Sequence, residues 1–322
     1  MATYKEKVGT AVQNIAGEDG VVTGQLWYDS SDSEFKYKYQ AYGNAWSTGN
    51  SMNTARKTLG GAGIQTAALG FGGWNGTAVT ALTESYNGTN WTELNDLNTS
   101  RSSLGGAGTQ PAALAFGGYS TTATNVTETW NGSNWTEVND LNTARTALTG
   151  SGTQTAALAF GGQGMSALTE LWNGTNWTEV NDLNTARRDL GGNGITTSSL
   201  AYGGDLPGVS ANTESWNGTN WTDVADLNTA RRLAGAGTDN TNALGIGGET
   251  PGGVSALTES WNGSIWTETT NLNVARQELA ATGASNSSAL AFGGTLNNPE
   301  VAFTEEWNAG INLGAWYTGG NL

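Results

Sequence analysis

The stretch NTARTALTGSGTQTAALAFGGQGMSALTELWNGTNWTEVNDL, residues 142–183, is one copy of a unit that recurs along most of this 322-residue chain. Each copy opens with an arginine, carries a Gly-Gly pair after a short apolar run, and closes with two aromatic residues and a polar turn. Six complete copies are recognisable in the sequence. Their arginines lie 42 to 45 residues apart, at Arg56, Arg101, Arg145, Arg187, Arg231 and Arg276.

Each copy contains four short segments with strand character. Ala147–Thr153 is small and Gly-rich, as expected of an innermost strand near an axis, and Ala156–Gly162 is apolar on both faces, as expected of a strand between two neighbours. The third segment ends in Thr-Glu-Ser-Trp or a close variant and the fourth contains Asn-Trp-Thr-Glu. A fixed period of this length with four strands per unit predicts an all-β β-propeller, one blade per unit.

Asn-Gly pairs separate the third and fourth segments in five copies. Because both central residues of a type I′ turn need positive φ, this dipeptide predicts type I′ hairpins there. The pairs stand at 87–88, 131–132, 173–174, 217–218 and 262–263.

The pattern resembles the Kelch repeat, in which a Gly-Gly doublet ends the second strand and aromatic residues lie on the third and fourth. The matching positions in one copy are Gly161-Gly162, Trp172 and Trp177. The resemblance covers about residues 50–322. It implies the propeller fold but leaves the function open, because Kelch propellers serve as enzymes, adaptors and structural modules.

The number of blades depends on the two ends of the chain. Upstream of the first full copy, Glu34–Tyr37 and Gly43–Trp46 match third and fourth strands, and the last copy keeps its outer segments at Thr304–Trp307 and Ala315-Trp316. We therefore expect seven four-stranded blades: an N-terminal arm at 1–7, then one propeller over 8–322, with 8–51 a degenerate first blade and 52–322 the regular repeats. The alternative is six blades plus an N-terminal hairpin or docking segment.

Composition narrows the possible functions. The chain has no His and no Cys, which excludes disulfides and Ser-His-Asp or Cys-His catalysis, and we expect no metal site and no cofactor. Its formal net charge is −15 at pH 7, and residues 58–322 hold no Lys, so nucleic acid is not an expected partner. Neither a membrane-spanning apolar run nor a signal-peptide pattern is present, so membrane insertion is not expected.

The recurring arginine is matched by a recurring glutamate. Because buried charges need partners, we expect each arginine to pair with a carboxylate or with carbonyls inside the blades. The alternative is a ring of arginines that binds an anion at the axis. The glutamates are Glu84, Glu128, Glu170, Glu214, Glu259 and Glu305.

Paired tryptophans and turn aspartates also recur in the copies. We expect pairs such as Trp130 with Trp135 to pack between blades; the alternative is a platform for stacking sugars. Asp96 and its counterparts are expected to bond turn amides, since they lack the dense ligand spacing of a calcium loop.

The loops between the second and third segments vary most in length, charge and aromatic content. In an up-and-down blade they share a face with the connections that carry the arginine, so a constant rim and variable loops form one surface. This arrangement predicts a ligand-binding face. The positions expected to bind are Trp74, Asn75, Tyr119, Asp205 and Glu249.

The N-terminal segment Gly24–Lys36, GQLWYDSSDSEFK, resembles a segment near the start of phage fibre and appendage proteins. The resemblance implies a non-enzymatic virion protein on the phage surface or tail. It would dock to other virion proteins through its N-terminal region and present the propeller to a host-surface glycan or protein. The alternatives are a Kelch-type protein–protein scaffold and, less favoured, a glycan hydrolase.

Overall fold

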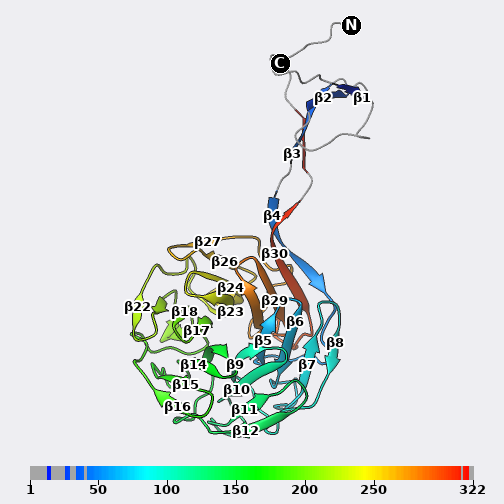
Figure 1. Cartoon of the computed structure of the whole chain (residues 1–322). Helices are drawn as coiled ribbons and strands as arrows, with labels where there is room; N and C mark the ends of the chain where they lie inside the picture. The colour runs from blue at the N-terminus through cyan, green and yellow to red at the C-terminus, as the bar shows by residue number, and fades with distance from the viewer. Residues whose placement is uncertain (1–12, 16–25, 30–33, 40–41, 313–314, 319–322) are drawn as a thin grey trace. The chain divides into compact units, whose positions relative to one another are not determined.

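The computed structural model describes residues 13–15, 26–29, 34–39, 42–312 and 315–318. The chain divides into two compact units, one formed by residues 45–308 and the other by residues 1–44 together with 309–322. The larger unit is a propeller of six blades, each with four antiparallel strands, as Figure 1 shows. The described residues form no helix, so none of them belongs to a helix that could cross a membrane.

The strands of the first five blades run outward from the axis in chain order. The first blade has β5 (Gly60–Ile64), β6 (Ala67–Phe71), β7 (Thr83–Tyr86) and β8 (Trp91–Glu93). The second has β9 (Gly105–Thr109), β10 (Ala112–Phe116), β11 (Thr127–Trp130) and β12 (Trp135–Val138). The third has β13 (Thr149–Thr153), β14 (Ala156–Phe160), β15 (Thr169–Trp172) and β16 (Trp177–Glu179).

The fourth and fifth blades follow the same order with small additions in their loops, and the sixth takes its outer strand from the N-terminal side of the chain. The fourth has β17 (Gly191–Ile195), β18 (Ser198–Tyr202), β21 (Thr213–Trp216) and β22 (Trp221–Asp223), with β19 (Asp205–Leu206) and β20 (Gly208–Val209) in its loop. The fifth has β23 (Arg232–Asp239), β24 (Asn242–Thr250), β26 (Thr258–Trp261) and β27 (Trp266–Glu268), with the short β25 (Gly253–Val254) beside β24. The sixth has β28 (Ala280–Ser285), β29 (Ser288–Phe292), β30 (Thr304–Asn312) and β4 (Tyr42–Gly49).

The expectation of seven blades is wrong, and the six-blade alternative is the one the structure shows. The outer strand of the sixth blade is β4, which precedes the first blade in sequence. Trp46 on β4 lies 5.4 Å from Trp307, ring centre to ring centre, the same separation as between Trp261 and Trp266 in the fifth blade. Asn273 also donates a hydrogen bond to the Trp46 carbonyl at 3.1 Å. Trp46 therefore occupies the fourth-strand position of the last blade.

The last copy cannot supply this strand itself because its chain does not turn after Trp307. The other copies turn at Asn-Gly, whereas here Asn308-Ala309 follows and β30 continues to Asn312. Trp316 lies on β31 (Ala315–Thr318), which belongs to the smaller unit. Because the chain does not turn back after Trp307, the last copy provides no fourth strand for the outer edge of β30. β4 pairs with this edge instead.

The smaller unit contains a sheet of its own. Its strand order is β1 (Gln13–Ile15), β2 (Leu26–Asp29), β3 (Glu34–Tyr39) and β31, with β1 parallel to β2 and the other pairs antiparallel. The segment expected to form a degenerate first blade is therefore divided between this sheet and β4. The arm expected at 1–7 lies outside the described residues.

The core of the propeller lies between adjacent blades. One cluster joins Leu69 and Phe71 of the first blade to Trp130 and Trp135 of the second. The indole Nε1 of Trp135 donates to Thr83 Oγ1 in the first blade at 3.0 Å, so the tryptophan pairs pack and bond across the blade boundary. Glycine permits the close approach: a Cβ on Gly106 would lie 2.5 Å from the Gly61 carbonyl oxygen of the neighbouring inner strand.

The hairpins between the third and fourth strands differ from the expected type I′ turn. Tyr86 pairs with Trp91, so the loop has four residues, and only its glycine, Gly88, has a positive φ. The Asn87 side-chain oxygen accepts hydrogen bonds from the amides of Thr89 and Asn90 at 3.0 and 2.8 Å. An Asx turn at Asn87 therefore replaces the two-residue turn.

Replacing Trp46 with alanine tests how the ring closes. Trp46 and Trp266 are both 5% exposed and hold equivalent positions, so Trp46→Ala and Trp266→Ala are each expected to lower the free energy of unfolding by about 3–5 kcal/mol. Denaturant unfolding measures both values. A Trp46→Ala protein that unfolds like the parent would contradict closure through β4.

Candidate functional site

The repeated arginine is buried inside its own blade. Arg145 Nη2 lies 2.8 Å from Glu170 Oε1, and its Nη1 donates to the carbonyls of Gly161 and Leu168 at 3.0 and 2.7 Å. Glu170 Oε2 in turn accepts from the Asn142 amide at 2.7 Å, at the start of the connecting segment. The same ion pair occurs in every blade: Arg56–Glu84, Arg101–Glu128, Arg145–Glu170, Arg187–Glu214, Arg231–Glu259 and Arg276–Glu305.

These arginines are not accessible to a ligand. Their side chains are at most 2% exposed, so they do not form an anion-binding ring that solvent can reach. Burial lowers the pKa of Arg276 to about 10, and the charge of Glu305 opposes this effect. The guanidinium therefore stays charged at neutral pH.

The backbone of the same arginine joins its blade to the preceding one. The amide of Gly162 in the third blade donates to the carbonyl of Arg187 in the fourth at 2.8 Å. Equivalent bonds connect all six blades, ending with Gly294 N–H to the Arg56 carbonyl at 2.8 Å. Both glycines of each pair have positive φ, and a Cβ on Gly72 would lie 2.5 Å from the Arg101 carbonyl oxygen. The Gly-Gly pair is thus required by this close approach.

The turn aspartates satisfy backbone amides on the third strand. Asp140 Oδ1 accepts from the Thr127 amide at 3.0 Å, and Asp182 Oδ1 accepts from the Thr169 amide at 2.9 Å. Asn271 takes the same role in the fifth blade, bonding the Thr258 amide at 3.0 Å. Since a neutral amide replaces the carboxylate there, the position serves backbone hydrogen bonding.

Adjacent residues Arg56 and Lys57 provide a test of the buried pairs. Arg56→Ala leaves Glu84 buried without its cation and should lower the free energy of unfolding by about 3–5 kcal/mol. Lys57 is 28% exposed and pairs with Glu278 at 3.0 Å, so Lys57→Ala should cost less than about 1 kcal/mol. Equal losses of stability in chemical denaturation would contradict this assignment.

The variable loops are anchored beside the arginines. Trp74, the first loop residue of the first blade, exchanges two backbone hydrogen bonds with Lys57 at 2.9 and 3.0 Å. Tyr119 does the same with Ser102 at 2.7 and 2.9 Å. The first loop residue of each blade therefore lies next to the segment that leads into the inner strand of the same blade, and the loops emerge around the axis on one face.

The five residues expected to bind a ligand differ in how exposed they are. Tyr119 is 43% exposed, and Trp74 and Asn75 are half-buried. Asn75 Oδ1 accepts from the amides of Thr77 and Ala78 at 3.1 and 2.9 Å, which shapes its own loop. Glu249 is half-buried, with a carboxylate oxygen 3.4 Å from Arg232 Nη1.

Asp205, by contrast, is buried and is not accessible to a ligand. It is 6% exposed, and its Oδ2 accepts from Arg188 Nε and Nη2 at 3.0 and 2.7 Å. A loop position that differs in charge from its counterparts here serves an ion pair within its own blade.

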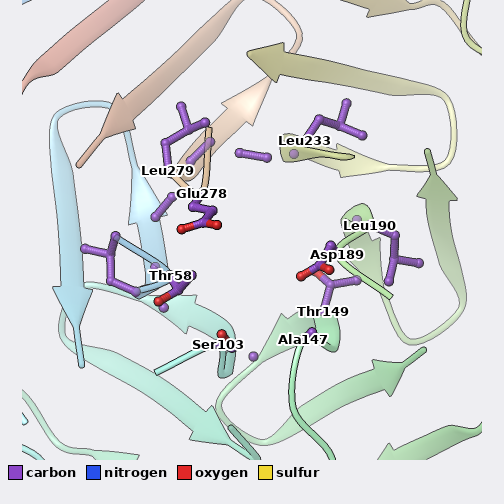
Figure 2. A pocket seen from close by; sticks show the side chains of 18 of the residues that line it. Thr58, Ser103, Ala147, Thr149, Asp189, Leu190, Leu233, Glu278 and Leu279 are labelled. Carbon is purple, nitrogen blue, oxygen red and sulfur yellow. The ribbon is translucent and has the colours of Figure 1, made fainter. Parts of the chain in front are cut away.

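A pocket of about 290 Å³ lies at the axis, among the inner strands where they begin. The residue two places after each arginine reaches it in five blades and has a left-handed backbone, with φ between 50° and 57°. Figure 2 shows these residues around the opening, with the carboxylates of Asp189 and Glu278 pointing into it. They are Thr58, Ser103, Ala147, Asp189 and Glu278.

This pocket was not predicted from the sequence, although the chain carries a signal for it. A leucine follows the arginine by three places in five copies, as in Arg187 to Leu190, but by two in Arg231 to Leu233. The fifth blade therefore lacks the residue that its neighbours place at the axis. Leu233 still packs against Gly203 of the preceding blade, as Leu190 packs against Gly161.

Partial desolvation of Asp189 within the axial pocket raises its pKa to about 6 despite the nearby cations Arg188 and Arg232, with Asp205 and Glu278 adding to the rise. Since this pKa exceeds the ordinary value of 3.8, the folded state binds the proton more tightly than the unfolded chain. The contribution to stability is present below about pH 4 and is lost as the pH rises through 6.

An Asp189→Asn protein is accordingly expected to melt at a higher temperature than the parent at pH 7.5. Asparagine also tolerates the left-handed backbone at this position. The difference should shrink towards pH 4, where Asp189 is protonated, and melting curves at several pH values measure it. A difference that grows as the pH falls would contradict the raised pKa.

No protein-family model matches the chain, and no curated protein is significantly similar to it. Within the ranges that the structure describes, no group of three or more acidic side chains could hold a metal ion. The geometry therefore leaves two candidate surfaces on one face of the propeller: the variable loops and the axial pocket that they surround.

Proposed function

We propose that this protein is a non-enzymatic component of a bacteriophage virion that presents its propeller for attachment to a host-surface glycan. The observation that supports this proposal best is the contrast between a constant scaffold and one variable face. The same ion pair and the same Gly-Gly bond recur in all six blades, whereas the loops around the axis differ in length and chemistry. A rigid scaffold with varied loops on one face suits recognition.

The division of the chain supports a separate docking part. Residues 1–44 form a compact unit with residues 309–322, distinct from the propeller. Its described strands include parts of the segment 24–36 that resembles phage fibre proteins; residues 24–25 and 30–33 of that segment lie outside the described residues. In this proposal the smaller unit contacts other virion proteins, which places the protein on the tail or surface of the particle.

A Kelch-type scaffold that binds a protein through the same face is the second candidate. The exposed loop residues Tyr119, Leu296 and Phe303 favour it as much as they favour a sugar, since aromatic and aliphatic side chains contribute to both kinds of interface. Binding of labelled protein to purified host polysaccharide distinguishes the two. A glycan hydrolase is less favoured, because all six repeated glutamates are committed to buried ion pairs; release of reducing ends would establish it.

The loop face is tested by replacing its aromatic residues. The double variant Trp74→Ala, Tyr119→Ala should weaken attachment of fluorescently labelled protein to host-cell envelopes about tenfold or more, because each lost stacking contact contributes about 0.5–1.5 kcal/mol. The melting temperature should change little, since the backbone bonds of both residues remain. Attachment is measured by titration against a fixed amount of envelope.

Ile265→Ala is the matched control. Ile265 is 55% exposed in a hairpin between third and fourth strands, on the opposite face of the blade, so this variant should attach like the parent. Undiminished attachment of the double variant would remove the case for the loop face. Absence of attachment by the parent to both envelopes and polysaccharide would overturn the proposed function.

A further inference from the structure

A chain of backbone hydrogen bonds surrounds most of the axial pocket. Thr58 N–H donates to the Glu278 carbonyl at 2.8 Å, Ser103 to Thr58 at 2.7 Å, Ala147 to Ser103 at 2.9 Å and Asp189 to Ala147 at 3.0 Å. Each bond crosses from one blade to the next. The chain of bonds therefore runs from the sixth blade through the first, second and third to the fourth.

The fifth blade does not continue this chain, because it lacks the residue at the equivalent position. Arg232 instead pairs directly with Glu249 as part of the β23–β24 ladder, followed by a register shift before Ala234. The Asp189 carbonyl and the Glu278 amide are thus the two ends of the open ring. An acceptor and a donor of the backbone flank the gap, and the side chains of the same two residues point into the opening (Figure 2).

The groups around this gap combine acceptors and donors. The carboxylates of Asp189, Glu249 and Glu278 accept hydrogen bonds, and the guanidinium of Arg232 and the hydroxyl of Ser103 donate them. Asp189 and Glu278 are 38% and 37% exposed, so their oxygens remain accessible. Each of these carboxylates lies beside a basic side chain: Asp189 Oδ2 is 3.6 Å from Arg188 Nε, and Glu278 Oε2 is 3.0 Å from Lys57 Nζ.

We propose that the axial pocket, opened by the one-residue deletion in the fifth blade, binds the terminal neutral sugar of the host glycan, an inference that rests on the proposed function. Its volume of about 290 Å³ accommodates a single sugar ring. Neighbouring sugar hydroxyls donate to the carboxylates of Asp189 and Glu278 and accept from Arg232. The next sugar units then lie along the loop face, where Trp74 and Tyr119 stand.

Charge selects against acidic sugars at this position. The pocket has three carboxylates and one guanidinium, and the whole chain has a formal net charge of −15. A uronic or sialic acid carboxylate would meet like charges in a partly enclosed site, which is unfavourable. We therefore expect a neutral hexose rather than an acidic sugar as the ligand.

The experiment compares simple glycosides by saturation-transfer NMR and titration. The probes are the methyl glycosides of glucose, mannose and galactose, with glucuronate as the acidic counterpart. At least one neutral glycoside should bind and glucuronate should not. Inserting one serine between Arg232 and Leu233 restores the length of the other copies, closes the ring and should abolish binding.

Two isosteric variants keep the test independent of whether the insertion folds. Asp189→Asn and Glu278→Gln retain the shape of the pocket and should each weaken binding about tenfold, because hydrogen bonds to charged groups contribute about 1.5–3 kcal/mol. Glu93→Gln, on the exposed outer strand β8, is the control and should bind like the parent.

The inference is wrong if no neutral glycoside binds, or if glucuronate binds as well as the neutral glycosides. It is also wrong if the folded insertion variant binds like the parent, or if both isosteric variants do. If the parent still attaches to host envelopes in these cases, the proposed function stands and the pocket assignment alone fails. If a neutral glycoside binds in the pocket but the parent attaches neither to envelopes nor to host polysaccharide, the proposed function fails instead.

Discussion

The buried ion pair between the repeated arginine and glutamate is the interaction on which the rest of this structure depends. A guanidinium and a carboxylate removed from water are costly unless the two charges pair and additional hydrogen bonds offset the loss of water. Here the arginine also bonds two carbonyls of its blade, and the glutamate accepts amides from the segment that enters the blade. The pair therefore joins the entry segment, the second strand and the third strand of one blade through two side chains.

The same residue couples neighbouring blades, because its carbonyl accepts the amide of the preceding Gly-Gly pair. Six such bonds form a closed ring, so the chain must complete its last blade next to its first. The outer edge of that blade would be open without β4, whose Trp46 supplies the indole that the other copies carry on their own fourth strands. Closure from the N-terminal side ties the beginning of the propeller to its end.

The ion pair and the backbone bond of the arginine explain why the fifth blade tolerates a shorter segment between its arginine and its inner strand. Arg231 keeps its ion pair with Glu259, but its Nε bonds the Gly247 carbonyl at 3.2 Å, whereas the equivalent Nε atoms of the other five arginines have no partner. Leu233 preserves the packing against Gly203. The deletion therefore alters the axis and leaves the blade interior intact, so the centre of the binding face can differ between blades without loss of the fold.

The sequence by itself determined the architecture of the regular blades. The period, the Gly-Gly pairs and the matched Arg and Glu positions predicted four-stranded blades with internal ion pairs, because each of these features acts within one copy or between adjacent copies. Only the tertiary structure decided the number of blades, since the pairing of β4 with β30 joins segments about 260 residues apart whose local patterns are those of any outer strand. It also decided that Asp205 is held by Arg188 and that a pocket lies at the axis, where the fifth blade lacks the residue that its neighbours carry after the arginines. Which groups remain accessible depends on contacts around a closed ring, and no single copy of the repeat contains that information.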